Sequence, residues 1–351
     1  MDISRWLEDD FEEIWENALP WEELSDANVM VTGASGLIGS FFVYSLLAYN
    51  RKFKSNIHII ALARDRERLK AKFVNYENVT IVAQDVCNPI RWDRPLDYIL
   101  HMACDVQPKT KALNPVGTAK TIACGMFEIC ELARKTGAKV IQLSSIDVYG
   151  KALDAKPFSE EANVMIDLSD SSYAYHEGKR MAEMICASYA TQFGMNYSVL
   201  RIGRVYGPTM NTTDSMVLSS FLYLAAGGEN LYLKSDGQQQ YTYVYVSDVA
   251  AALYFLMLEG GRTAYNCGEG EVVEELRFGQ VAQLVADINH VVLHKSKMDV
   301  SENRIYSGTV YSVMTSEKLM KLGWRKKNDI QRGILKTSKV LRQLRSDANG
   351  D

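Results

Sequence analysis

The sequence lacks the features that mark several classes of protein. Its six cysteines are scattered through apolar segments without a C-x-x-C pair, which disfavours both a zinc site and a disulfide framework. No apolar run approaches the roughly 18 residues of a membrane-spanning helix, and the N-terminus is acidic where a signal peptide is basic and then apolar. The net charge of -4 is too balanced to indicate a nucleic-acid partner. These absences predict a cytoplasmic protein with reduced cysteines that binds neither nucleic acid nor membrane.

What the sequence does contain is an alternation of strand and helix patterns. Buried strands are predicted at 28–33, 56–63, 79–83, 97–102, 139–144 and 197–202, with helices between them at 36–49, 65–73, 116–136 and 175–193. Strands separated by helices of this length are typical of parallel β-α-β units. The pattern predicts an α/β protein with a Rossmann-type, doubly wound parallel sheet, whose ligands bind beyond the C-terminal ends of the strands.

The same reading predicts four regions along the chain. Residues 1–26 form an acidic helical extension, and 27–207 form the dinucleotide-binding domain, to which 241–269 return. A smaller C-terminal substrate-binding lobe comprises 208–240 and 270–335, and 336–351 are a basic helix end and tail. Further helical patterns lie near 215–226, 247–258, 276–288 and 315–322. The basic stretch 325–345 is interpreted as a solvated helix face.

A glycine-rich turn, G-x-x-G-x-x-G, stands between the first predicted strand and the first predicted helix. The residues predicted to contact a cofactor here are Gly33, Ser35, Gly36, Leu37, Ile38 and Gly39. Glycine lets the backbone turn tightly and approach a pyrophosphate, whose charge the unpaired amides and the helix dipole stabilise. Close packing alone is the structural alternative, but the strand-turn-helix context favours a dinucleotide.

The residues after the second and third strands bear on the choice of dinucleotide. Arg64 could hold a 2′-phosphate or stack on adenine, whereas Asp65 could reach a ribose, so NAD and NADP both stay open. Asp85 and Val86, after the third strand, are placed to meet the adenine ring.

One tyrosine stands out for its partner. Of 19 tyrosines, only Tyr175 is followed four residues later by a lysine, Lys179, and at that spacing both side chains share one helix face. The ammonium can stabilise a phenolate and lower the tyrosine pKa from about 10, so that Tyr175 can remove a hydroxyl proton while a nicotinamide accepts the hydride. Such a pair is often only an exposed helix contact. Ser144 and Ser145, at the C-terminal end of an upstream strand, favour catalysis.

Together these motifs resemble the extended short-chain dehydrogenase/reductase superfamily and, within it, the NAD-dependent epimerase/dehydratase family. The marks are TGASGLIG at 32–39, HMAC at 101–104, SSIDVYG at 144–150, RIGRVYGP at 201–208 and YVYVSDVA at 243–250. The resemblance implies that Ser145 hydrogen-bonds the substrate hydroxyl, Tyr175 is the base and Lys179 binds the nicotinamide ribose. It also implies that Met102, Ala103 and Cys104 lie on the cofactor side.

The resemblance further implies oxidation of a nucleotide sugar at C4 to a ketone, from which epimerisation, dehydration or decarboxylation can follow. Dehydratases of the group have Asp-Glu after the serine, and UDP-glucuronate decarboxylases have Ser-Glu, whereas this chain has Ile146-Asp147. Ile146 cannot donate a proton to a departing hydroxyl, which argues against dehydration. Asp147 is either a second acid or base or a loop residue. Local similarity is greatest to UDP-glucuronate decarboxylases.

The substrate lobe departs from the family pattern. Arg204 replaces an asparagine, and Thr209 and Tyr241 replace arginines that contact the nucleotide diphosphate in relatives. Each lost charge-assisted hydrogen bond is worth roughly 1.5–3 kcal/mol, so other cations have to take over. The candidates are Arg204, Lys234 and Arg304.

The remaining expectations concern histidines, assembly and rival functions. None of the five histidines has metal-ligand spacing, and His101 and His176 are interpreted as packing or supporting residues, so no metal is expected. Relatives pair through the helices corresponding to 116–136 and 175–193, which implies a homodimer. The rival functions are an NADPH-dependent carbonyl reductase and a catalytically silent nucleotide-sensing protein.

Overall fold

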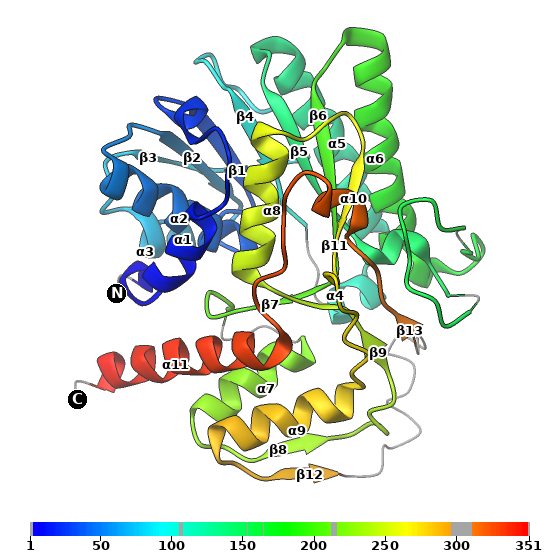
Figure 1. Cartoon of the computed structure of the whole chain (residues 1–351). Coiled ribbons are helices and arrows are strands. Elements are labelled where there is room, and N and C mark those ends of the chain that lie inside the picture. The colour runs from blue at the N-terminus through cyan, green and yellow to red at the C-terminus, as the bar shows by residue number, and fades with distance from the viewer. Residues whose placement is uncertain are drawn as a thin grey trace.

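The central element of the computed structural model is a seven-stranded parallel sheet (Figure 1). The structure describes residues 3–104, 108–152, 154–163, 165–211, 216–295 and 311–349. In spatial order the strands are β3 (Val79–Ala83), β2 (His58–Ala63), β1 (Asn28–Thr32), β4 (Tyr98–His101), β5 (Lys139–Ser145), β6 (Tyr197–Ile202) and β11 (Ala264–Cys267). The predicted α/β, doubly wound sheet is confirmed, and its edge strand β11 comes from the segment expected to return to this domain.

Helices cover both faces of the sheet because every buried strand presents alternate residues to opposite sides. Val29 and Val31 of β1 face the core shared with α2 (Leu37–Phe53) and α8 (Val246–Leu258), while Met30 faces the core shared with α5 (Pro115–Thr136) and α6 (Ala174–Phe193). Helix α3 (Arg66–Phe73) connects β2 to β3. The layers bring the C-terminal ends of β1, β4, β5 and β6 to one edge of the sheet.

A second group of elements lies beyond that edge, in the lower half of Figure 1. It contains α7 (Val217–Ala226), α9 (Phe278–Asn289) and α11 (Ile330–Asn349), with β8 (Leu231–Leu233) parallel to β12 (Leu293–Lys295). Two more strand pairs link it to the sheet: β7 (Arg204–Tyr206) with β10 (Tyr243–Tyr245), and β9 (Gln240–Tyr241) with β13 (Tyr311–Ser312). The sequence pattern predicted none of these short pairs.

Two of the shorter helical segments, α4 (Pro108–Leu113) and η3 (Ile146–Tyr149), carry residues of the site described below. The others are η1 (Ile3–Trp6), α1 (Glu8–Trp15), η2 (Trp21–Leu24), η4 (Ser171–Tyr173) and α10 (Glu317–Met320). Helix α4, which directly follows β4, was not predicted. No helix in the described ranges is long and apolar enough to cross a lipid bilayer.

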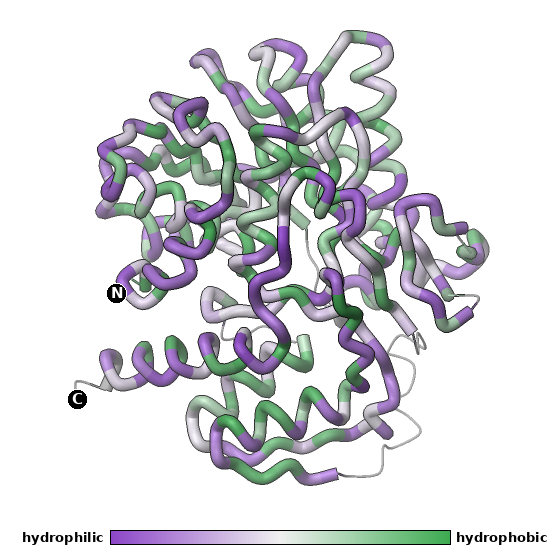
Figure 2. Tube along the Cα trace, viewed as in Figure 1, coloured by the Kyte–Doolittle hydropathy of each residue, from purple (hydrophilic) through white to green (hydrophobic). Residues whose placement is uncertain are grey.

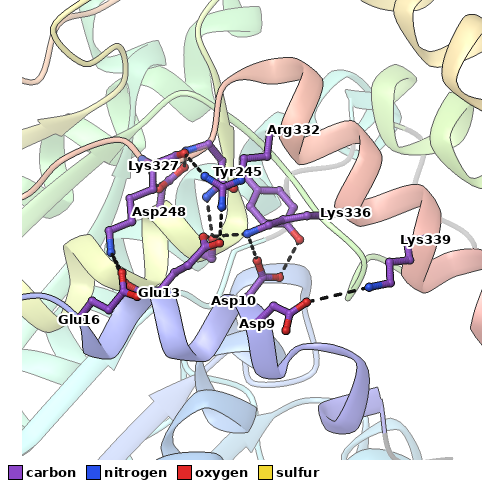
Figure 3. A network of polar contacts seen from close by, with 12 residues as sticks. Asp9, Asp10, Glu13, Glu16, Tyr245, Asp248, Lys327, Arg332, Lys336 and Lys339 are labelled. Carbon is purple, nitrogen blue, oxygen red and sulfur yellow. Dashed lines mark hydrogen bonds and ion pairs between the residues drawn. The ribbon is translucent and has the colours of Figure 1, made fainter.

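The two ends of the chain meet in an acidic–basic seam, drawn in Figure 3. Lys336 of α11 donates to Asp10 and to Glu13 of α1, each at 2.7 Å, and Arg332 donates to Glu13 at 2.6 Å. Tyr245, the last residue of β10, donates its hydroxyl to Asp10 at 2.8 Å. We call these five residues the seam.

The seam corrects the interpretation of the basic stretch 325–345 as a solvated helix face. The turns of α11 alternate between hydrophilic and hydrophobic residues in Figure 2, and its apolar residues Ile334, Val340 and Leu341 are buried. Lys336 is basic but faces the acidic helix, where its side chain is only 19% exposed. The sequence pattern missed this because the complementary acids lie at the other end of the chain.

Candidate active site

The glycine-rich turn has the geometry that a bound pyrophosphate needs. Gly33 has a φ of 69°, and a Cβ placed there would lie 2.9 Å from the carbonyl carbon of Met102. A Cβ on Gly39 would lie 2.3 Å from the Gly33 carbonyl oxygen. Gly36 is the N-cap of the 17-residue helix α2, so the unpaired amides of that helix lie beside the turn. Neither Gly33 nor Gly39 therefore tolerates a side chain. We call the turn Gly33–Gly39 the cradle, and its geometry fits a dinucleotide phosphate.

The residues predicted for the adenosine end lie at the ends of β2 and β3. Arg64 is exposed directly after β2. Asp65 is the N-cap of α3, where its side chain accepts a hydrogen bond from the Arg68 amide at 3.0 Å. Asp85 accepts from the Cys87 amide at 2.9 Å. The capping role of Asp65 is a local reason for an acid at this position, independent of a ribose.

Hydrogen bonds between Thr32 and the segment 101–103 join the C-terminal ends of β1 and β4, where His101 is buried. The Thr32 hydroxyl accepts hydrogen bonds from the Met102 and Ala103 amides, both at 3.1 Å, and lies 2.9 Å from His101 Nδ1. With both amides donating to it, the hydroxyl donates its own proton to Nδ1. Burial, assisted by the charge of Lys179, lowers the pKa of His101 to about 3. His101 is therefore a neutral packing residue, as the sequence predicted.

Tyr175 is the residue where the predicted catalytic groups meet. It lies in the first turn of α6, is 6% exposed, and Lys179 Nζ lies 5.9 Å from its ring centroid. Burial is the largest influence and raises the pKa of Tyr175 well above its usual 10. A hydrogen bond from Ser145 opposes this rise. A buried tyrosine can act as a base only if nearby positive charge favours its phenolate.

Lys179 is held in place by the strand beneath it. Its ammonium donates to the Leu143 carbonyl of β5 at 2.7 Å, and the side chain is buried. Burial lowers its pKa from the usual 10.5. Because α6 brings Tyr175 and Lys179 to one helix face and β5 ends at Ser145, the three predicted groups share one edge of the sheet.

Asp147 lies between two cations. Lys111 Nζ is 3.7 Å from Oδ2, and an Arg204 Nη2 atom is 3.9 Å from Oδ1. Burial alone would raise the pKa of Asp147, but Arg204 and Lys111 outweigh burial and lower it to about 2. Asp147 is therefore ionised in the neutral range.

Of the three predicted substrate cations, Arg204 reaches the site. Its guanidinium carbon lies 4.9 Å from the centroid of Tyr241, and Asp147 raises its pKa against the opposing effect of burial. Lys234 follows β8 and is exposed, while Arg304 lies outside the described residues. Thr209, which replaces a family arginine, donates instead to the Leu37 carbonyl at 2.8 Å.

Two sets of residues escaped the sequence prediction. Lys111 lies on the unpredicted helix α4 and contacts both Tyr175 and Asp147. The second set is a network in which Arg201 donates to Glu183 at 2.7 Å and to the Tyr149 hydroxyl at 2.9 Å. This network joins the ends of β5 and β6 to α6, and its members lie within or next to the motifs that carried the resemblance. Among the described residues, no group of metal-ligating side chains occurs.

Comparison with known proteins places the chain in a family. The sequence profile of the NAD dependent epimerase/dehydratase family matches residues 29–268. The chain belongs to this family. UDP-glucuronic acid decarboxylase 6 of Arabidopsis thaliana is 33% identical over 254 residues, covering 71% of this chain and 72% of that protein. UDP-glucuronic acid decarboxylase 1 of Xenopus tropicalis is 28% identical over 323 residues, covering 92% of this chain and 74% of that protein.

Solved structures of family enzymes share the fold. UDP-glucose 4-epimerase of Thermotoga maritima, solved with UDP-glucose, superposes with a TM-score of 0.74 at 24% identity, covering 90% of this chain and 99% of that one. dTDP-glucose 4,6-dehydratase of Bacillus anthracis, solved with NAD, gives a TM-score of 0.73 at 19% identity, with coverage of 92% and 98%. The predicted family and Rossmann-type fold are thus confirmed, and of the two dinucleotides that the sequence left open the family is NAD-dependent.

Proposed function

We propose that this chain is an NAD-dependent nucleotide-sugar enzyme that oxidises C4 of the sugar to a ketone, then decarboxylates or epimerises it and returns the hydride. The observation that carries the proposal is the meeting of Ser145, Tyr175 and Lys179 at the end of β5, next to the dinucleotide cradle. NAD, when bound, supplies the hydride acceptor. Gly33–Gly39 would hold its pyrophosphate, and Lys179 would hold its nicotinamide ribose.

The side chains divide the proton chemistry. Tyr175, as phenolate, takes the proton of the C4 hydroxyl, and Ser145 donates a hydrogen bond to the same oxygen to orient it. When the ketone is reduced again, the proton returns from Tyr175 to that oxygen. A C4 ketone also makes a C6 carboxylate a β-keto acid: the C5–C6 bond breaks, carbon dioxide leaves, and the electron pair passes to the C4 oxygen as an enolate. C5 then takes a proton from water, which restores the ketone for reduction.

The residues after Ser145 support decarboxylation as the first fate and 4-epimerisation as the second. Ile146 has no proton to give to a departing hydroxyl, and Asp147 is ionised between Lys111 and Arg204. Both observations argue against dehydration. Curated relatives named UDP-glucuronic acid decarboxylases support a nucleotide-linked hexuronate as substrate. Arg204, together with Lys234 and Arg304, would bind the diphosphate.

We also propose a homodimer through α5 and α6, in the cytoplasm. The apolar residues Ile122, Met126, Ile129, Leu132 and Ile185 are buried within the chain, so they do not form the pairing surface. The exposed apolar residues on these helices are Val116, Phe127, Met181, Met184 and Phe193. None of the six cysteines is in a disulfide, which supports a reducing compartment.

A mass-spectrometric screen tests the proposed function. The purified protein is incubated with NAD and with UDP-, dTDP-, GDP- and CDP-linked sugars, including UDP-glucuronate. Loss of carbon dioxide indicates decarboxylation, and an unchanged mass with altered chromatography indicates epimerisation. The matched control is Tyr175→Phe, which must be inactive in the same screen. Loss of water, or no conversion of any sugar, would refute the proposal.

A further inference from the structure

Lys111 of α4 is a second lysine, beside Lys179 of α6, whose ammonium lies near the ring of the proposed base Tyr175. Its Nζ lies 4.0 Å from the ring centroid of Tyr175, closer than the 5.9 Å of Lys179 Nζ. The residue comes from α4, an element separate from both β5 and α6. Tyr175 is thus approached by two ammonium groups from two different elements.

We propose that Lys111 is a second cation that, together with Lys179, keeps the Tyr175 hydroxyl acidic enough to act as a base. Lys111 acts through Tyr175 and is therefore a positioning residue for the electrostatics of the base. The inference rests on the proposed role of Tyr175 in removing a hydroxyl proton.

The need for a second cation follows from what surrounds the base. Burial strongly favours the neutral phenol of Tyr175, and the negative charge of Asp147 adds to that effect. A hydrogen bond with Ser145 and the charge of Arg204 oppose both effects. The Lys179 ammonium is farther from the ring, at 5.9 Å from its centroid, and donates to the Leu143 carbonyl. The Lys111 ammonium, 4.0 Å from the ring centroid of Tyr175, supplies positive charge closer to the ring than Lys179 does.

Lys111 acts on Tyr175 by two routes. Directly, a cation over an aromatic face is attracted more strongly when that ring carries a phenolate charge. Indirectly, it pairs with Asp147 at 3.7 Å and offsets the carboxylate that would otherwise disfavour the phenolate. Its side chain is 22% exposed and that of Asp147 is 14% exposed, so solvent screens these interactions only in part.

The titratable and charged groups around Tyr175 come from every element packed on it. They are Cys104 after β4, Lys111 on α4, Asp147 on η3, His176 and Lys179 on α6, and Arg204 on β7. Burial lowers the pKa of His176, which leaves it neutral. Lys111, Lys179 and Arg204 are the cations of this group, and Lys111 and Arg204 both contact Asp147. Removal of Lys111 therefore leaves two of the three cations.

Nuclear magnetic resonance of tyrosine labelled with 13C at Cζ tests the inference without a substrate. The NAD-loaded protein is titrated from pH 6 to 10, and the Tyr175 signal is assigned by its disappearance in Tyr175→Phe. With NAD bound, the positive charge of the oxidised nicotinamide would add to those of the two lysines and Arg204, so wild-type Tyr175 should titrate below 10 in spite of its burial. Lys111→Met should raise its pKa by on the order of one unit or more. Lys111→Arg, which keeps the charge, should stay near the wild-type value.

The control is Lys120→Met, which removes the same charge from the exposed face of α5. It should leave the Tyr175 titration unchanged. A wild-type Tyr175 that remains protonated up to pH 10 would overturn the inference, and so would a Lys111→Met protein with the wild-type titration. If Lys111→Met does not fold, Lys111→Gln gives the same comparison. Because no sugar is present, failure of the substrate screen and failure of this titration are separate results.

Discussion

The Lys336 ammonium lies 2.7 Å from the carboxylate of Asp10, although 326 positions separate the two residues in the chain. Asp10 is 4% exposed and receives a second hydrogen bond, from the Tyr245 hydroxyl. Burial raises the pKa of Asp10, and Lys336 opposes that rise. The pair therefore holds the N-terminal helix against β10 and α11.

Removal of one partner of this pair should strongly destabilise the protein. We expect Lys336→Met to lower the free energy of unfolding by about 3 kcal/mol, because it leaves the Asp10 carboxylate buried without its cation. Urea unfolding followed by circular dichroism measures the change. The control is Lys339→Met, whose exposed 4.0 Å contact with Asp9 should contribute less than about 0.5 kcal/mol. Equal losses in the two variants would contradict the role of the seam.

Asp248 should make stability depend on pH. Its carboxylate accepts the Lys327 and Asn328 amides, yet burial, the dominant influence, raises its pKa from 3.8 to about 6. The folded chain thus binds this proton more tightly than the unfolded chain does. The stabilising contribution is complete below pH 3.8 and is lost as the pH rises through 6.

The variant Asp248→Asn isolates this contribution. The unfolding free energy of wild type minus that of the variant should fall by about 3 kcal/mol between pH 4 and 7. Urea titrations at several pH values measure the difference, and Asp287→Asn, at an exposed position, is the control. A difference that does not vary with pH would show that Asp248 titrates normally.

Tyr175→Phe should abolish turnover while NAD stays bound. Loss of a general base costs at least about 100-fold in rate, whereas the cradle at Gly33–Gly39 is untouched. Turnover of the sugar nucleotide identified in the screen and the NAD released on denaturation are the two measurements. Tyr232→Phe, at an exposed position, is the matched control. Activity of Tyr175→Phe within tenfold of wild type would remove Tyr175 from the mechanism.

Asp147→Asn should move the pH dependence of turnover toward acid. The carboxylate of Asp147 raises the pKa of Tyr175, so its neutralisation makes the phenolate easier to form. The limb of the kcat/KM profile that reports ionisation of Tyr175 should therefore shift to lower pH, while Asp147→Glu should leave this limb in place. An upward shift in Asp147→Asn would contradict this electrostatic role, and loss of the alkaline limb would mean that Asp147 itself donates a proton.

The sheet and the grouping of Ser145, Tyr175 and Lys179 at its edge could be predicted because both leave local signals. Apolar strands such as 58–63 alternate with helices in sequence, and the spacing of Tyr175 and Lys179 follows directly from the helical repeat. The site then follows from topology, since parallel strands end at one edge.

The missed features depend on contacts between segments distant in sequence. Helix α4 has the short polar sequence PKTKAL, which carries no apolar periodicity, so the sequence did not indicate Lys111. Most apolar residues of α5 and α6 pack between these helices and the sheet, which the helical spacing alone did not indicate. The pattern around Lys336 predicts a solvated side chain because its partner, Asp10, lies far from it in the sequence.

The seam also orders events during synthesis. Asp10 leaves the ribosome more than three hundred residues before Lys336 does. Until then the carboxylate of α1 has no ammonium to accompany it into the interior, and burial without one is costly. Helix α1 of the nascent chain must therefore remain hydrated until α11 has been translated.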